Sequence, residues 1–255
     1  MINEYFRPKT INEALDLLGN GSGYLPIGGG STLKSMPGDF SVVDLQSLGL
    51  DAITESENHL HIGATVTLEQ LLGHFQNDTS FKTAISIEAS RNQREQFTVA
   101  GTICSANGRS PLLTLLSSLD LLMNWEPGNI KISVGDWLAQ EQSWQNGMLI
   151  IGFTLDKKAK VRFESIGRSP VDQPVICLAI TTWPSKRLRI VAGGFGDCPT
   201  TILDGNLTDD VSAAIAMALS ESSDEWASAD YRIHSASVLA SRMLADTNLF
   251  SGAKQ

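Results

Sequence analysis

Apolar side chains at helical spacing mark several segments of the chain. The first segment lies between Thr10 and Gly19, where four apolar residues fall on one face of a helix. Thr10 and Glu13 have the spacing of a capping box, in which a hydroxyl and a carboxylate bond the free amides at the helix start. Thr67 and Gln70 repeat that spacing before a second apolar stretch. The same pattern predicts further helices over residues 81–92, 111–119, 208–219 and 229–245.

Short runs of apolar or alternating residues lie between these helices and are typical of strands. The predicted strands cover residues 24–27, 41–45, 59–64, 121–123, 130–134, 148–153, 162–167, 175–182 and 188–192. Residues 97–104 are interpreted as a strand followed by a turn around Gly101. The pattern changes after a basic turn at residues 157–160. We therefore expect an α+β protein with a larger domain over residues 1–158 and a smaller sheet-plus-helices domain over residues 159–255.

Composition narrows the classes of function. The chain has 255 residues and a formal net charge of −9, which argues against a nucleic-acid partner because phosphate binding needs a basic face. No signal peptide is evident, and no apolar stretch approaches the ~20 residues that span a membrane. Three widely spaced cysteines favour neither disulfides nor an iron–sulfur or zinc site, so we expect a reducing, cytoplasmic location. His59 and His61 share a strand face without an evident third ligand, and we expect no metal site.

A run of three glycines, residues 28–30, is the first candidate binding feature. It follows an apolar strand that ends at Ile27. Without Cβ atoms the backbone can approach a ligand closely, and successive amides can surround a diphosphate. Ser31 and Thr32 add two hydroxyl groups. A plain tight turn explains the same residues, and neither G-x-G-x-x-G opening a helix nor G-x-x-x-x-G-K-[ST] is present.

A second candidate is the short segment 98–102, which Arg94 precedes. Its small residues are flanked by Thr98 and Thr102 and could form another anion-binding turn. A strand end or a bulge accounts for the same residues when the segment is considered alone.

The order of several motifs resembles a known family more closely than any one of them does. Residues 27–33 resemble the phosphate loop A-G-G-T-[DS]-L of the FAD-binding, medium-sized subunits of molybdenum hydroxylases. This family includes the medium subunit of carbon monoxide dehydrogenase and the flavin domain of xanthine dehydrogenase. Residues 98–103 lie where it has T-[IV]-G-G-N-[LI]. The other matching segments are residues 5–14, 43–45, 60–64, 168–172, 192–194, 229–232 and 238–242, so that the resemblance covers about residues 4–245.

The resemblance implies a PCMH-type (vanillyl-alcohol-oxidase-like) FAD-binding fold, followed by a small C-terminal domain like that of carbon monoxide dehydrogenase flavoproteins. It implies non-covalent FAD, with the diphosphate between the two loops. The implied cofactor-binding residues are Ile27, Gly28, Gly29, Gly30, Ser31, Thr32, Leu33, Thr98, Val99, Ala100, Gly101 and Thr102. Such a subunit belongs to a hetero-oligomer, in which an iron–sulfur small subunit and a molybdopterin large subunit supply electrons that FAD passes to an external acceptor. The cofactor carries the redox chemistry, so no catalytic residue is expected from this chain.

The chain departs from the family pattern mainly at the second loop. Ala100 replaces the first glycine, Thr102 replaces the asparagine, and Glu95 stands where an asparagine usually follows the arginine. A lysine that lies near the flavin in some relatives aligns with Glu164, while Arg109 could add positive charge for the diphosphate. These changes support an alternative, a flavin-free structural or assembly subunit of the same complex. A stand-alone flavoprotein oxidase would need a larger second domain.

Overall fold

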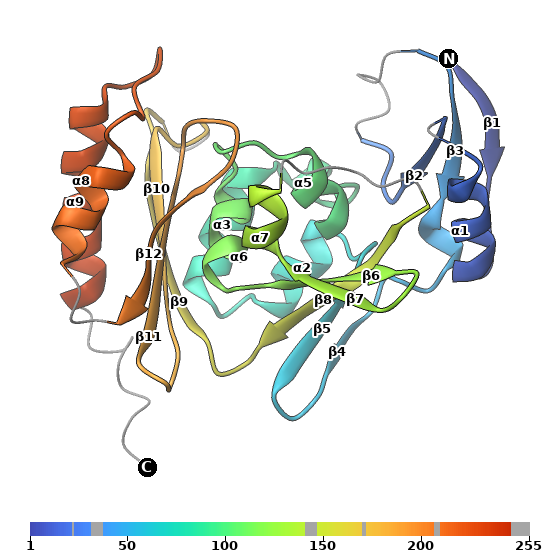
Figure 1. Cartoon of the computed structure of the whole chain (residues 1–255), viewed down its shortest axis with the longest axis horizontal. Helices are drawn as coiled ribbons and strands as arrows, with labels where there is room; N and C mark the ends of the chain where they lie inside the picture. The colour runs from blue at the N-terminus through green and yellow to red at the C-terminus, as the bar shows by residue number, and fades with distance from the viewer. Residues whose placement is uncertain (22, 32–37, 141–146, 170–171, 207–209, 246–255) are drawn as a thin grey trace. The chain divides into compact units, whose positions relative to one another are not determined.

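The computed structural model describes residues 1–21, 23–31, 38–140, 147–169, 172–206 and 210–245 (Figure 1). The contacts divide the chain into two compact units that do not follow the order of the sequence. The first unit contains Met1–His74, Arg91–Ser105 and Leu121–Leu155. The second contains Phe75–Ser90, Ala106–Asp120 and the chain from Asp156 onward. The division into residues 1–158 and 159–255 stays a prediction.

A small parallel sheet opens the first unit. Its strand order is β1 (Ile2–Phe6), β3 (Phe40–Asp44) and β2 (Tyr24–Ile27), and α1 (Ile11–Gly19) packs against it. All five residues of β3 are buried, as expected for a central strand that carries side chains into packed surroundings on both faces. Thr10 caps α1 as predicted, while the carboxylate of Glu13 accepts from the amide of Lys9.

A five-stranded sheet forms the rest of the first unit. Its strand order is β4 (Ile53–Glu55), β5 (His59–Gly63), β8 (Leu149–Asp156), β6 (Leu122–Glu126) and β7 (Ile130–Ser133). The helices of this unit are α2 (Leu68–His74), α4 (Arg91–Arg94), α5 (Val99–Ser105) and α7 (Val134–Ala139). Thr67 and Gln70 make the predicted capping box at the start of α2.

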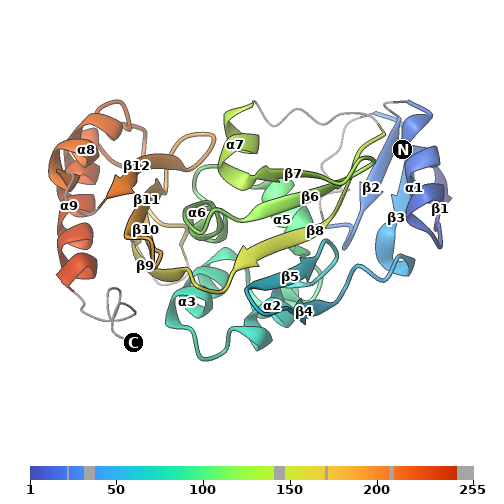
Figure 2. The same ribbon diagram turned by 60° about the horizontal axis from the view of Figure 1, so that its bottom comes forward.

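The second unit is a four-stranded antiparallel sheet with helices on both faces (Figures 1 and 2). Its strand order is β12 (Thr200–Asn206), β11 (Arg187–Gly193), β10 (Ile176–Thr182) and β9 (Lys160–Ile166). One face carries α3 (Thr79–Glu88) and α6 (Pro111–Ser118), and the other carries α8 (Val211–Ala218) and α9 (Ala229–Ala245). Every residue of β10 is buried because helices cover both sides of this central strand.

One predicted element is wrong. Residues 97–104 were expected to form a strand and turn, but α5 begins at Val99. The hydroxyl of Thr98 accepts a hydrogen bond from the amide of Gly101, which is the geometry of an N-cap and starts a helix. The pattern also gave no signal for β4, β12 and α7, which are short or lie at a sheet edge.

Candidate functional site

The first candidate loop follows the end of a parallel strand pair. Ile27 of β2 lies opposite Asp44 of β3, so both strands end at the same edge and the glycines continue from there. Ligands of parallel sheets bind outside this carboxyl edge in many folds. The amides of Gly29, Gly30 and Ser31 donate to no acceptor among the residues that the structure describes. Three consecutive amides are therefore available to an anion.

The glycine run is also needed for packing within the first unit. A Cβ atom on Gly29 would lie 1.7 Å from the carbonyl oxygen of Gln96, and one on Gly28 would lie 2.8 Å from Oγ1 of Thr98. The loop after β2 therefore lies directly against the segment that enters α5. The positive φ of Gly30, 70°, is a further reason for glycine in this turn.

The second candidate loop uses its amides internally. Each amide from residue 99 to residue 102 donates to the chain itself: Val99 to the carbonyl of Val66 (2.8 Å), Ala100 to that of Ala64 (3.2 Å), Gly101 to Oγ1 of Thr98 (3.2 Å) and Thr102 to the carbonyl of Thr98 (2.8 Å). A diphosphate would have to displace one of these partners to bind any of these amides. The second loop can therefore contact a diphosphate, but none of these four amides is free to donate a hydrogen bond to it.

Side-chain directions in α5 separate an inner from an outer face. Thr102 is 7% exposed, and its buried hydroxyl has no hydrogen-bond partner among the described residues. Gly101 and Cys104 are exposed and Ala100 is partly exposed, so these residues form the outer face. The threonine at the family's asparagine position thus points into the protein rather than toward a ligand.

The remaining predicted site residues lie at the end of β2 or outside the described part of the chain, and Arg94, which precedes the second loop, is paired. Ile27 is the last residue of β2 and is partly buried, whereas Thr32 and Leu33 lie outside the described residues. Arg94 makes an ion pair with Glu69, with 2.7 Å between Nε and Oε2, and its side chain is 13% exposed. Its charge is therefore largely matched within the first unit.

A buried carboxylate beside the first loop was not predicted to have a role. Asp44 is 2% exposed and accepts a 2.6 Å hydrogen bond from the hydroxyl of Tyr5. The guanidinium of Arg7 lies 3.4 Å from the same carboxylate oxygen. The hydrogen bond to Asp44 raises the pKa of Tyr5. No sequence signal showed these partners, because they meet only when β1 and β3 pair.

Arg109, a candidate for phosphate binding, is engaged within the second unit. Its guanidinium lies 4.3 Å from the ring centre of Trp226 and donates to the carbonyl of Pro174 at 3.4 Å. Arg168 lies over the same indole at 4.6 Å. Glu164, at the aligned lysine position, makes an ion pair with Arg242. These contacts stabilise the second unit, and they give Arg109, Arg168 and Glu164 partners that the sequence did not reveal.

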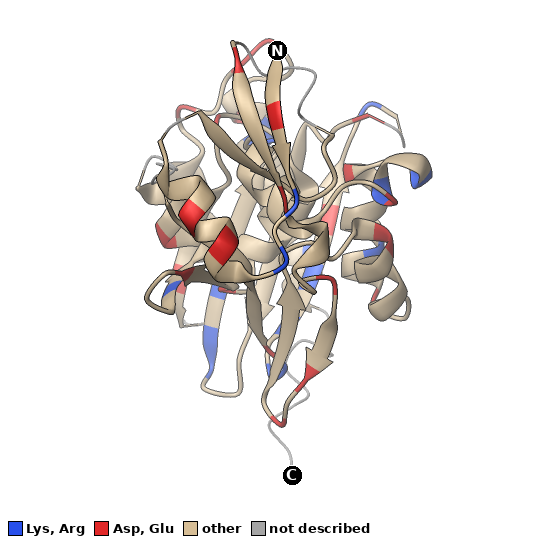
Figure 3. Ribbon diagram, turned by 90° about the vertical axis from the view of Figure 1, so that its right-hand side faces the viewer, with Lys and Arg blue, Asp and Glu red and all other residues tan. Residues whose placement is uncertain are grey.

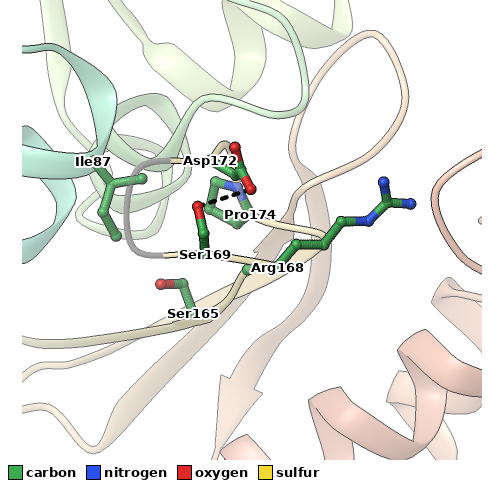
Figure 4. Close-up of a pocket in the computed structure, with 7 residues that line it drawn as sticks. Ile87, Ser165, Arg168, Ser169, Asp172 and Pro174 are labelled. Atoms are coloured by element: carbon green, nitrogen blue, oxygen red, sulfur yellow. Dashed lines mark hydrogen bonds between the residues drawn. The ribbon is translucent and has the colours of Figure 1, made fainter.

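A pocket of about 270 Å³ lies in the second unit (Figure 4). Ser169 and Asp172 hydrogen bond to each other at its rim, and Arg168 extends away from the other residues drawn there. The remaining lining residues are Ile87, Ser165, Gly167 and Pro174. Ser169 and Asp172 pair a hydroxyl with a carboxylate, but the lining residues include no third group that orients the pair and no convergent set of charges, so the pocket shows no complete catalytic arrangement.

Charge and metal chemistry add little to the site. In Figure 3, basic residues are interspersed with acidic ones, and the whole chain has a formal net charge of −9. Among the described residues, no group of three His, Cys, Asp or Glu side chains could hold a metal ion. Within the same part of the chain, no helix is long and apolar enough to cross a membrane.

FAD fits the first loop better than the second. A diphosphate is an anion, and residues 29–31 offer it three amides without acceptors among the described residues. The second loop offers the small, exposed surface of Ala100 and Gly101. The fit therefore rests on one loop that binds and a neighbouring loop that supports it.

Comparisons with known proteins identify the family of this chain and its fold. A family model described as the FAD binding domain in molybdopterin dehydrogenase matches residues 1–155. YgfM of Escherichia coli (strain K12), an uncharacterized protein, is 26% identical over 257 residues, which cover 96% of each chain.

Two solved structures share the fold over nearly the whole chain. Quinoline 2-oxidoreductase from Pseudomonas putida 86 matches with a TM-score of 0.77 and 18% identity, over 98% of this chain and 97% of the other. Carbon monoxide dehydrogenase from Hydrogenophaga pseudoflava, in a form that lacks the Mo-pyranopterin moiety, matches with a TM-score of 0.77 and 18% identity, over 95% and 96%. The likeness confirms the predicted α+β, PCMH-type fold.

Proposed function

The chain belongs to the family of FAD-binding domains in molybdopterin dehydrogenases, and from this premise we propose that it is the electron-transfer subunit of a molybdenum hydroxylase. In this role it takes electrons from an iron–sulfur subunit and passes them through FAD to an external acceptor. The observation that carries the proposal is the row of three amides at residues 29–31 without acceptors among the described residues, at the end of a buried parallel strand pair.

The residues of this chain would bind and orient the cofactor. The amides of Gly29, Gly30 and Ser31 would hold the diphosphate, while the exposed surface of Ala100 and Gly101 would limit water on the adjacent side. FAD, when bound, supplies the redox chemistry, and the protein supplies position and electrostatics. The proposal therefore assigns no general acid or base to this chain.

The proposal includes partners and a location. We propose an iron–sulfur small subunit and a molybdopterin large subunit in a hetero-oligomer, because a flavin domain alone has no site for the hydroxylated substrate. The three cysteines, Cys104, Cys177 and Cys198, are all free thiols, which is consistent with a reducing cytoplasm. The isolated chain is expected to be inactive on an organic substrate.

A second candidate function is a flavin-free assembly subunit of the same complex. The saturated amides of the second loop favour it, because they leave the diphosphate with donors from one loop only. The pairing of Arg94 with Glu69 points the same way, since it leaves less positive charge for an anion. The two candidates share the fold and differ in whether FAD is retained.

An absorbance spectrum distinguishes the two candidates. The folded chain is incubated with FAD and desalted, first alone and then together with its partner subunits. Electron transfer requires retained absorbance near ~450 nm, which is typical of a bound oxidised flavin. A folded chain that stays colourless in both preparations contradicts the electron-transfer proposal and supports the assembly subunit.

A further inference from the structure

The carbonyl group of Gly28 is held by a side chain from the neighbouring strand end. Nε2 of Gln46 donates a 3.3 Å hydrogen bond to this carbonyl oxygen. Gln46 lies in the short 3-10 helix Leu45–Ser47 that follows β3. Because Ile27 is opposite Asp44 in the parallel pair, a residue just beyond β3 reaches the first residue beyond β2.

The orientation of the Gln46 side chain is fixed from its other side. Its Oε1 atom accepts a 3.1 Å hydrogen bond from Nη2 of Arg7, so the amide nitrogen is the atom that faces Gly28. The backbone amide of Gln46 donates to Oδ1 of Asp44 at 3.0 Å. The other oxygen of Asp44 is held by Tyr5 and approached by Arg7. The buried carboxylate of Asp44 thus holds the backbone of Gln46 and lies beside Arg7, which holds its side chain.

Because a peptide group is planar, the hydrogen bond from Gln46 to the carbonyl of Gly28 also fixes the direction of the Gly29 N–H. In a trans peptide the carbonyl of Gly28 and the N–H of Gly29 point in opposite directions. A hydrogen bond that holds the carbonyl toward Gln46 therefore directs the Gly29 N–H away from Gln46. That N–H has no acceptor among the described residues. Consecutive glycines otherwise allow many peptide orientations, and ordering them on binding costs free energy.

We propose that Gln46 is a positioning residue that orders the first loop for the FAD diphosphate before the cofactor binds. The inference rests on the proposed function and deepens it, because it assigns a role to a residue outside both glycine loops. Arg7 and Asp44 act through Gln46, the first by fixing its side-chain amide and the second by fixing its backbone. The diphosphate then meets amides that already point toward it.

Two substitutions test the donor role. Gln46→Glu keeps the shape and the contact with Arg7, but places an acceptor against the carbonyl of Gly28. Gln46→Ala removes the donor without adding charge. Without the donor, the peptide between Gly28 and Gly29 has to be ordered when FAD binds, which costs about 1 kcal/mol or more, so both variants are expected to raise the Kd for FAD at least about 5-fold. Gln46 is exposed, so the Tm without FAD should change by less than about 2 °C.

The measurements are flavin fluorescence quenching for Kd and the ¹⁵N-labelled amide signal of Gly29. In the original chain that signal should move when FAD saturates the site, and in Gln46→Glu it should move less. Gln140→Glu is the matched control, because Gln140 is an exposed glutamine at the end of α7 and receives the same charge change. The control should bind FAD like the original chain.

The outcomes separate this inference from the proposed function. If the original chain binds FAD and both Gln46 variants bind it equally well, the positioning role is wrong while the proposed function stands. A loss in Gln46→Glu alone, with Gln46→Ala unchanged, shows charge repulsion and also overturns the positioning role. If the original chain does not retain FAD with its partner subunits present, the proposed function fails, and the inference fails with it.

Discussion

At residues 29–31 three consecutive amides have no acceptor among the described residues, whereas at residues 99–102 four consecutive amides all donate to the chain itself. Both segments contain small residues next to a hydroxyl side chain, and the two loops lie against each other in the first unit. The segments that lie next to each loop determine whether its amides have acceptors. The first loop follows a strand at the edge of its sheet, while the second pairs with residues 64–67 and then becomes a helix.

This contrast shows that small residues alone do not make an anion site. Glycine and alanine allow a close approach, but binding also needs donors that the fold has not already used. In the second loop, the hydroxyl of Thr98 accepts the hydrogen bond of the Gly101 amide, which an anion would otherwise accept. The comparison therefore predicts that substitutions in the first loop affect FAD binding, whereas substitutions in the second affect mainly stability.

The largest effect is expected for Gly29→Ala. The added Cβ would lie 1.7 Å from the carbonyl oxygen of Gln96, so the loop must move away from its neighbour. Such overpacking costs about 1–3 kcal/mol of unfolding free energy, and the displaced amides should lose FAD binding. Chemical denaturation and flavin fluorescence measure the two effects. Gly73→Ala is the control, because nothing lies within 4 Å of its Cβ position in α2. Equal behaviour of the two variants would contradict the close packing of the loops.

A smaller effect is expected for Thr98→Val. The change removes the hydroxyl that caps α5 and keeps the shape of a buried side chain. Loss of an N-cap costs about 1 kcal/mol, which thermal unfolding would show as a lower Tm. The Kd for FAD should change less than about 2-fold, a factor that corresponds to about 0.4 kcal/mol. A much larger loss of affinity at unchanged Tm would mean that the second loop binds the cofactor directly.

Ala100→Gly restores the glycine of the family pattern and tests whether the second loop affects FAD binding or only stability. Ala100 lies in the first turn of α5, and its amide already donates to Ala64. The glycine should lower the unfolding free energy by about 0.5–1 kcal/mol because it is a poor helix former. FAD affinity should stay within about 2-fold of the original, as judged by the same fluorescence titration. A tenfold gain would show that the methyl group of Ala100 obstructs the diphosphate.

The sequence predicted those parts of the fold that depend on local chemistry. The caps at Thr10 and Thr67 were confirmed because hydroxyl and partner lie within one helical turn. The strand predicted over residues 97–104 was wrong because the start of α5 depends on pairing with residues 64–67, far away in the chain. The fold class was predicted from the order of motifs along most of the chain, and the family model and the solved structures confirmed it.

In the candidate site, too, the sequence did not reveal contacts between segments that are distant in the chain. The glycine run could be found from the sequence alone. The sequence could not show that Gly29 is required because the backbone of Gln96 lies against it. The contact from Gln46 to Gly28 depends on the register of two parallel strands, which no spacing rule reveals. Arg109 was a reasonable source of positive charge, yet its aromatic partner Trp226 comes from a distant segment of the second unit.

The smallest effect concerns the support beneath the first loop and depends on pH. The hydrogen bond to Asp44 raises the pKa of Tyr5 above its ordinary value of 10.0. A group whose pKa is raised by folding contributes its full stability below the unfolded pKa and loses it as the pH rises through the folded value. The original chain should therefore have a slightly higher Tm than Tyr5→Phe between pH 7 and pH 9, by about 1–3 °C. The gap should narrow above about pH 10, where the phenol of the unfolded chain begins to ionise.

The measurement is a pair of thermal unfolding series over that pH range, without FAD. FAD affinity at pH 7 should fall less in Tyr5→Phe than in Gln46→Ala, because Asp44 keeps its contacts with Arg7 and with the amide of Gln46. A Tm gap that widens with pH would contradict the assigned direction of the Tyr5 pKa. An affinity loss in Tyr5→Phe that equals the loss in Gln46→Ala would mean that the carboxylate, rather than the glutamine, sets the orientation of the first loop.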